Sequence, residues 1–590
     1  MMMLYHPSIN LPFSDQEGQY FQLFREQTAS ELSGFFDSGF WTRSVLRECH
    51  AAAPIRHAVV ALGALYKTLE KSNESPRSSP EGDPADSALR HWEMAFRQYS
   101  HACTALVKTQ AADSTSHRTR LMASVLLACF DSFVGDHKQA IVQIQTGLGL
   151  LEQLRAERRR SFYATSEEPV EEELTQMFTR LAIQAKSYDM AFHFPQPWVV
   201  RLTSPNQGQD PSSPASDVSS PTSINHDSIP ERFTSVMEAR VTWDKLCERI
   251  FRFTETMFAH AQNGVMGVLP TSLQQYGISF KKDIEAWSKA FEHILASRTA
   301  PGISSQEKAA IAVLKSFQIM TNILFMMTFS DSEMHFDNFT PYFKAIVDLA
   351  LEVVGDEERR AAAKRCPDPS FCHHQHRCQP DIFGGHAYAA RHIKPSFSAD
   401  LGIVPPLYVV ATKCREPTIR RQAIQLLRSS ARREGMWDSE LTARIGMWIA
   451  EIEEEDFDLY PGYRSGSTIP TPSSSPVQTQ SRPLTACASS PHPEFDNLPL
   501  GPGGNARASI SSASTTSPPI GGGGFTSLSP RTPQASPLQE QKRTVPEERR
   551  VMVRAVEFDL RERSAVIQLG SRNLKTGTPD LKTRVTRIRW

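Results

Sequence analysis

The sequence predicts an all-α fold of ten or more stacked antiparallel helices, a long disordered linker, and a C-terminal β-hairpin packed on the helical body. Two observations carry this prediction. Apolar residues recur at helical spacing through most of the first 460 residues, whereas alternation with period two first occurs near the C-terminus. Between these regions the chain is rich in serine, proline and glycine.

Residues 1–202 form the first half of the predicted helical domain. An early apolar stripe begins at Pro54, which suits the first turn of a helix because no N–H donor is needed there. A polar break at Gly135-Asp136-His137 separates two later stripes, so we expect an antiparallel helix pair around it. A disordered loop rich in serine and proline is predicted at 72–88.

A second disordered loop is predicted at 203–230, and residues 231–460 form the second half of the helical domain. Its most apolar segment, about 306–330, contains polar residues such as Lys315. The most apolar window, around 311–329, is therefore too polar for a bilayer span, and we expect a helix here and no membrane partner. Pro417 stands near the expected start of another helix.

Residues 461–543 are predicted to form a disordered linker, because fourteen prolines and few apolar residues leave too little surface to bury. Seven Ser-Pro or Thr-Pro pairs in it indicate sites for proline-directed kinases, with low-complexity composition as the alternative explanation. Residues 544–590 predict a β-hairpin and a basic C-terminal tail, with a bulge near Ala555 where the alternation changes phase.

Composition excludes several classes of protein. The 590 residues carry a formal net charge of −1, which is not the charge of a polybasic nucleic-acid binder. Nine unevenly spaced cysteines and an N-terminus without a basic and apolar leader predict an intracellular, thiol-reduced chain. The sequence contains no His-Glu-x-x-His, Gly-x-Ser-x-Gly or Walker-type motif, so we do not expect an enzyme.

Three helical stretches resemble one family, the fungal-specific transcription factor domain found behind zinc binuclear cluster (six-cysteine) DNA-binding modules. Their order and spacing match the family across about residues 10–460, and the terminal hairpin resembles the family's usual ending. The three stretches are Phe40-Trp41-Thr42-Arg43 leading to Leu65, Leu126-Leu127-Ala128-Cys129-Phe130 leading to Leu148, and Val404-Pro405-Pro406-Leu407-Tyr408 leading to Asp438.

The resemblance implies a nuclear regulator of RNA polymerase II genes whose helical body is a regulatory and protein-interaction module without chemistry of its own. Its implied partners are other transcription proteins or a homodimer partner, with DNA contacted only indirectly or nonspecifically. The alternative is a non-catalytic cytosolic or nuclear adaptor derived from the same family. A resemblance at the level of the fold does not identify target genes.

One departure from the family concerns its DNA reader, an N-terminal cluster of six cysteines in Cys-x2-Cys-type halves. The first cysteine here is Cys49, inside the helical region, and no Cys-x2-Cys pair occurs in the sequence. We therefore expect no cofactor in this chain, with zinc only if a six-cysteine cluster exists upstream. The consecutive Met1, Met2 and Met3 fit either a natural regulator without its DNA reader or a gene model that starts too late.

The densest group of metal-ligating residue types lies between two expected helices. Thiolates and imidazoles at such density can hold zinc, but their spacing fits no standard finger, and nearby prolines predict an irregular loop. We therefore predict an incidental polar loop and no metal site. The candidate ligands are Cys366, Cys372, His373, His376 and Cys378.

Two basic groups are candidates for nuclear import or phosphate contact, with plain solubility as the competing interpretation. One ends a helix, where cations also offset the helix dipole. The other lies in the segment from Lys542 to Trp590, which carries thirteen Lys or Arg and six Asp or Glu. A glutamate-rich run at 451–455 is interpreted as a solvated helix face. The basic candidates are Arg158, Arg159, Arg160, Arg584, Arg587 and Arg589.

Overall fold

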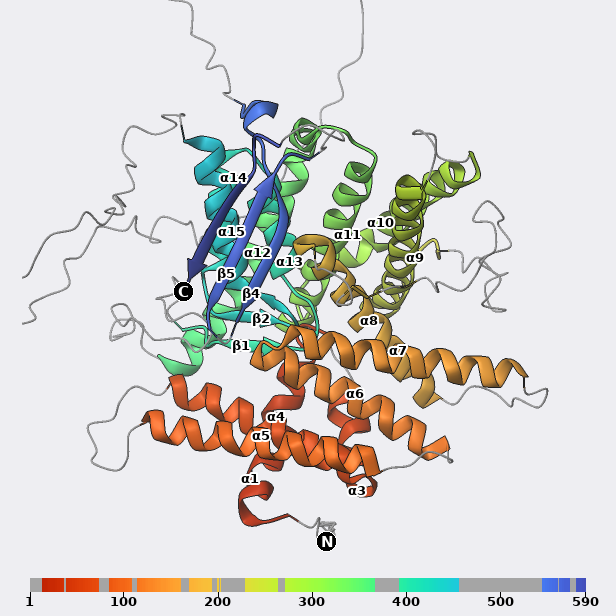
Figure 1. Ribbon diagram of the computed structural model, residues 1–590, viewed down its shortest axis with the longest axis vertical. Coiled ribbons are helices and arrows are strands. Elements are labelled where there is room, and N and C mark those ends of the chain that lie inside the picture. The colour runs from red at the N-terminus through yellow and green to blue at the C-terminus, as the bar shows by residue number, and fades with distance from the viewer. Residues whose placement is uncertain are drawn as a thin grey trace, which may run out of the picture. The chain divides into compact units, whose positions relative to one another are not determined.

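Helices make up most of the described chain, which confirms the predicted all-α class (Figure 1). The predicted linker at 461–543, with its Ser-Pro and Thr-Pro pairs, and nearly all of the loop at 203–230 lie outside the described residues. The described residues within 1–457 and 544–590 form one compact unit. The computed structural model describes residues 13–36, 39–73, 84–108, 114–160, 169–193, 199–200, 202, 229–263, 271–366, 392–455, 544–560, 562–572 and 580–590.

The first part of the chain forms packed pairs of helices, with α4 against α5 and α6 against α7. The predicted pair around residue 135 is α6 and α7, and its turn requires Gly135, whose φ is 86°. α5 begins at Pro84, inside the loop predicted at 72–88. The helices are α1 (Asp15–Leu23), α2 (Ala29–Leu32), α3 (Val45–Ala51), α4 (Ala53–Asn73), α5 (Pro84–Lys108), α6 (Ser114–Val134), α7 (His137–Arg160) and α8 (Pro169–Phe192).

The second part continues the same architecture. α11 has the length and composition of a membrane span, but 67% of its most apolar window is buried inside the protein, as in a core helix. Pro417 is the first residue of α14, as predicted. The elements are α9 (Val236–Asn263), α10 (Thr271–Ser297), α11 (Ser305–Thr328), the 3-10 helix η4 (Glu333–Phe339), α12 (Thr340–Arg365), α13 (Val404–Lys413), α14 (Pro417–Leu427) and α15 (Ser439–Glu454).

A small sheet inside the helical body was not predicted. β1 (Ser396–Ser398) pairs in parallel with β2 (Arg432–Glu434), which pairs antiparallel with β3 (Trp437–Asp438). Strands of two or three residues are too short for alternation to show in the sequence. The carboxylate of Glu434 accepts hydrogen bonds from the backbone N–H groups of residues 402, 403 and 404 at 2.8 to 3.0 Å, which ties this sheet to the start of α13.

The C-terminal segment forms a three-stranded antiparallel sheet of β4 (Met552–Asp559), β5 (Ser564–Gly570) and β6 (Arg584–Arg589), in that order. The pairing of β4 with β5 confirms the predicted hairpin, and its register shifts between Val553 and Ala555, where a bulge was expected. β6 corrects the expectation of a basic tail. Its arginines are interspersed with valine, threonine and isoleucine, and it pairs with β5 along its whole length.

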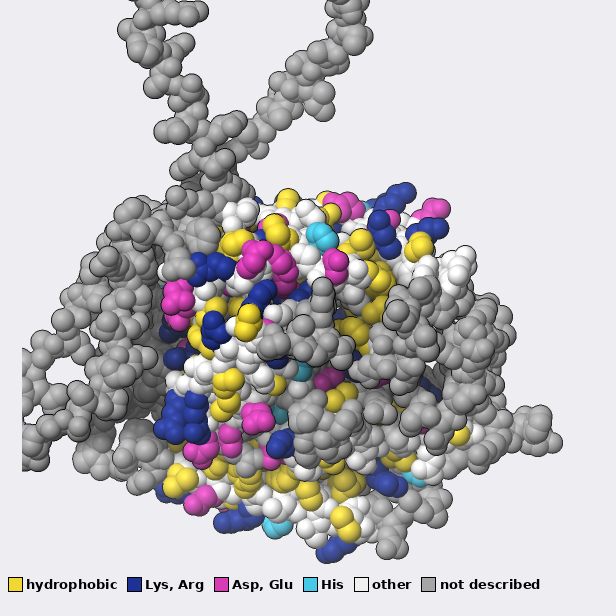
Figure 2. All heavy atoms as spheres, turned by 45° about the horizontal axis from the view of Figure 1, so that its top comes forward, with side chains coloured by type: hydrophobic (Ala, Val, Ile, Leu, Met, Phe, Trp, Pro, Cys, Tyr) yellow, Lys and Arg dark blue, Asp and Glu magenta, His cyan; other side chains and the backbone are white. Residues whose placement is uncertain are grey.

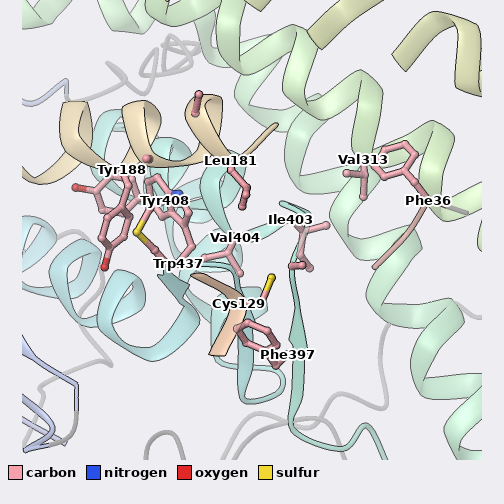
Figure 3. Close-up of a cluster of buried hydrophobic side chains, with 14 of the residues drawn as sticks. Phe36, Cys129, Leu181, Tyr188, Val313, Phe397, Ile403, Val404, Tyr408 and Trp437 are labelled. Carbon is pink, nitrogen blue, oxygen red and sulfur yellow. The ribbon is translucent and has the colours of Figure 1, made fainter. Parts of the chain in front are cut away.

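The buried side chains form one continuous core through the helical body and the C-terminal sheet. Figure 3 shows Tyr188 of α8, Tyr408 of α13 and Trp437 of β3 gathered in this core, with Phe397 beside Cys129 in the same region. On the face shown in Figure 2, positive, negative and apolar side chains are interspersed among the described residues. The core therefore joins elements that lie hundreds of residues apart in the sequence.

Candidate functional site

A buried group of charged side chains joins the helical body to the C-terminal segment. We call it the Glu333–Glu453 cluster. The junction of α13 and α14, the end of α15 and the start of η4 supply its body side, and the residues from 544 onward supply the rest. Its members are Glu333, Asp337, Lys413, Arg415, Arg420, Glu453, Glu454, Glu547, Arg550 and Arg572.

Glu453 lies at the end of α15 and is fully buried. Its carboxylate oxygens lie 2.8 Å from Nη2 of Arg415 and 2.6 Å from Nη2 of Arg420. The backbone N–H of Val551 also donates to it, at 3.0 Å. Burial alone raises the pKa of a carboxyl, but the two guanidinium groups outweigh it and lower the pKa of Glu453 to about 2. Glu453 is therefore an ionised anchor for the strand that enters the C-terminal sheet.

Glu333 is the second buried carboxylate and lies at the start of η4. It forms ion pairs with Nζ of Lys413 at 3.2 Å and Nη1 of Arg572 at 2.6 Å. Nη2 of Arg415 lies 3.1 Å from it, so Arg415 bridges Glu333 and Glu453. Burial opposes ionisation of Glu333, and these three cations override it, lowering its pKa to about 2.

Arg550 and Glu547 fasten the first turn of the C-terminal segment to η4. The guanidinium of Arg550 is fully buried and contacts both carboxylate oxygens of Asp337, at 2.9 and 2.6 Å. The carboxylate of Glu547 accepts hydrogen bonds from the backbone N–H groups of Glu333 and Met334, at 3.2 and 3.0 Å. A carboxylate at the start of a helix satisfies N–H groups that have no partner within the helix.

Two residues counted with the predicted basic tail belong to this cluster or its border, which corrects that interpretation. Arg572 pairs with Glu333 and also donates to the carbonyl of Met327 at the end of α11. Nζ of Lys582 donates to the carbonyl of Glu547 at 2.8 Å. These cations are used inside the protein, so the local positive charge available to an outside partner is smaller than the sequence indicates.

Apolar contacts complete the attachment of the sheet. The ring of Phe558 on β4 lies 5.2 Å from that of His137 and 5.9 Å from that of Tyr188. Burial and the charge of Arg433 lower the pKa of His137 to about 3, so its imidazole is neutral at physiological pH. Turn residue Gly135 approaches the sheet so closely that a Cβ there would lie 2.7 Å from the Cβ of Leu560.

The chemistry of the cluster is that of attachment. Glu333 is paired with three cations and Glu453 with two, and a pKa of about 2 keeps both carboxylates ionised near neutral pH. No group of three or more histidine, cysteine or acidic residues among the described parts of the chain is arranged to hold a metal ion. The arrangement binds one part of the protein to another.

The structure describes the side chains of only some of the sequence-predicted site residues, namely Cys366, Arg584, Arg587 and Arg589. Of the metal candidates only Cys366 is described, as the residue that ends α12; Cys372, His373, His376 and Cys378 lie outside the described residues. Residues 158–160 end α7, and nothing is described of their side chains. Arg584, Arg587 and Arg589 lie on β6 with exposed side chains.

The described cysteines do not match a zinc binuclear cluster. Cys49, Cys129 and Cys247 are buried in three different helices, and Cys414 is buried directly after α13. Burial raises the pKa of the Cys49 thiol to about 12 and that of Cys414 to about 11, which disfavours the thiolate that zinc requires.

Sequence reasoning missed the buried charge cluster, although one signal for it exists. The glutamate-rich run at 451–455 was interpreted as a solvated face, and the burial of Glu453 overturns that interpretation. Arg420 falls on the apolar face of α14, next to Ile419 and in line with Ala423 and Ile424. A charged residue within an apolar stripe indicates a buried ion pair, but the sequence does not say which acid it meets.

Comparison with known proteins gives one informative match. The chain is 22% identical over 503 residues to the aspercryptin biosynthesis cluster-specific transcription regulator atnN of Emericella nidulans, covering 77% of this chain and 76% of that protein. No protein-family profile matches the chain. No solved structure matches it. The match supports a place in a fungal transcription factor family.

Proposed function

We propose that this protein is a fungal transcriptional regulator of RNA polymerase II genes, acting in the nucleus through a helical regulatory and protein-interaction body. The observation that carries the proposal is the similarity to a cluster-specific transcription regulator across three quarters of both chains. The charge cluster agrees with a role in attachment, since each of Glu333 and Glu453 has a pKa lowered to about 2 and is held by at least two cations.

On the face shown in Figure 2 the described residues offer other transcription proteins, or a second copy, a surface of mixed charge, while Arg415 and Arg420 are engaged internally. DNA contact by this chain is then indirect or nonspecific, because the candidate contact residues whose side chains are described, Arg584, Arg587 and Arg589, lie exposed on a strand and not on a recognition helix. Phosphate contacts of this kind position a protein without reading base sequence. No cofactor is required for this role.

The test tethers the full chain to an unrelated DNA-binding module at a reporter promoter and images the tagged protein in fungal cells. We expect nuclear accumulation and a change in reporter transcription relative to the module alone. Replacing Arg158, Arg159 and Arg160 by alanine tests their part in import, with the same substitutions at Arg584, Arg587 and Arg589 as the matched comparison. Persistent exclusion from the nucleus with an unchanged reporter would replace this proposal with the cytosolic adaptor.

A further inference from the structure

The outer strand of the C-terminal sheet presents an open edge. In the sheet order β4-β5-β6, no described strand pairs with the far side of β6. Trp590 donates its N–H to the carbonyl of Arg563 at 3.0 Å, so these two residues form a hydrogen-bonded pair of the antiparallel ladder between β5 and β6. Hydrogen-bonded pairs alternate in such a ladder, so the backbone groups of residues 584, 586 and 588 point to β5. Those of Val585, Arg587 and Arg589 point away from it.

The same three residues present their side chains to solvent. Val585 is 62% exposed, and Arg587 and Arg589 are exposed beside it, whereas Thr586 and Ile588 are partly buried. No described carboxylate forms an ion pair with Arg587 or Arg589. The edge therefore combines backbone groups that pair with no described residue, two positive charges and a β-branched apolar side chain.

Charge decides which kind of strand this edge can accept. A second copy of the chain, added antiparallel, would place β6 arginines against one another, and like charges directly opposite destabilise a sheet. The acidic residues of this sheet, Glu557 and Asp559, lie on β4, two strands away from β6. A strand with acidic residues opposite the two arginines would be stabilised instead.

We propose that β6 is a docking edge for an extended acidic segment of a partner protein, which adds as a fourth strand. Added antiparallel, the partner carries two acidic residues separated by one position, opposite Arg589 and then Arg587. An aliphatic residue follows two positions later, opposite Val585. Main-chain hydrogen bonds supply affinity in this mode, and alternate side chains supply specificity. This inference goes beyond the proposed function and does not depend on it.

The test measures binding of a fluorescent peptide to the full chain by anisotropy. The probe is a seven-residue threonine peptide with glutamate at its second and fourth positions and valine at its sixth. A peptide with lysine in place of both glutamates is the control. We expect saturable binding of the acidic peptide, at least tenfold weaker binding of the lysine peptide, and protection of the 581–590 amides from hydrogen exchange when the acidic peptide is bound.

Two pairs of variants separate the edge from the charge. Val585→Pro removes an N–H that points away from β5, so it blocks the edge while the β5 ladder stays intact, and Val585→Ala keeps that N–H. We expect at least a tenfold loss of peptide affinity for the proline variant and less than threefold for the alanine variant. Arg587→Glu weakens binding at least tenfold, and Arg25→Glu, an exposed arginine on the helical body, leaves it unchanged.

Three results would overturn the proposal. The first is that the acidic peptide fails to bind the wild-type chain at millimolar concentration. The second is that Val585→Pro binds it as well as Val585→Ala does, with hydrogen exchange of β5 showing the sheet intact in both. The third is that a duplex DNA of arbitrary sequence binds instead, with an affinity that Arg587→Glu reduces and Val585→Pro does not. That last outcome would assign β6 to phosphate contact.

Discussion

Replacing Glu453 by glutamine tests whether the buried charge cluster holds the C-terminal sheet. Glutamine has nearly the same shape and its carbonyl still accepts the N–H of Val551, so the variant removes charge rather than volume. Arg415 and Arg420 then face a neutral group in a dry site. Removing one partner of a buried ion pair costs about 3–5 kcal/mol.

The lower end of that range applies here, because both arginines keep another acceptor. Arg415 retains Glu333 at 3.1 Å, and Arg420 retains Glu454 at 3.2 Å. A loss of about 3 kcal/mol in the local opening free energy corresponds to roughly a hundredfold faster hydrogen exchange of the β4 amides. Hydrogen exchange suits this chain better than global unfolding, because a protein of this size need not unfold in one step.

The matched control is Glu451→Gln, an exposed glutamate one half-turn away on the same helix. A surface substitution of this kind changes stability by less than about 0.5 kcal/mol. We expect β4 protection to fall in the Glu453 variant and to stay at the wild-type level in the control. Equal protection of β4 in both variants would refute the idea that this carboxylate anchors the sheet.

Three further predictions concern acid, backbone strain and metal. The pKa of Glu333 is lowered to about 2 from 4.5 and that of His137 to about 3 from 6.5. The folded protein is therefore more stable above the unfolded pKa of each group, and this stability is lost as the pH falls from the unfolded pKa to the folded pKa. Hydrogen exchange of the C-terminal sheet, followed from pH 7 to 3, checks this loss, and protection that does not change with pH would contradict it. Gly435→Ala speeds hydrogen exchange of the β2 and β3 amides by the equivalent of more than about 1 kcal/mol, because the φ of Gly435 is 55° and a Cβ there would overlap the side-chain amide of Gln184. Gly149→Ala, where nothing lies within 4 Å of the added Cβ, leaves this exchange unchanged. A zinc chelator leaves the thermal midpoint of this chain unchanged, and a drop would point to a metal site.

The sequence alone determined the helical class, the paired helices around residue 135 and the bulged hairpin near Ala555. Each of these depends on the period of apolar residues or on turn chemistry within a few positions, so a local reading of the chain is sufficient. The expected disordered segments at 203–230 and 461–543 lie almost entirely outside the described residues and remain predictions.

Only the tertiary structure decided which charged residues are buried and which are exposed. Arg572 and Arg587 look alike in the sequence, yet one is paired with Glu333, 239 residues earlier in the chain, and the other lies on an open strand edge. Glu453 and Glu451 stand in one glutamate-rich run, and only the first meets two arginines in the core. The energy of a charge is set by the solvent and partners that surround it after folding. Those partners come from distant segments, so no local pattern in the sequence specifies them.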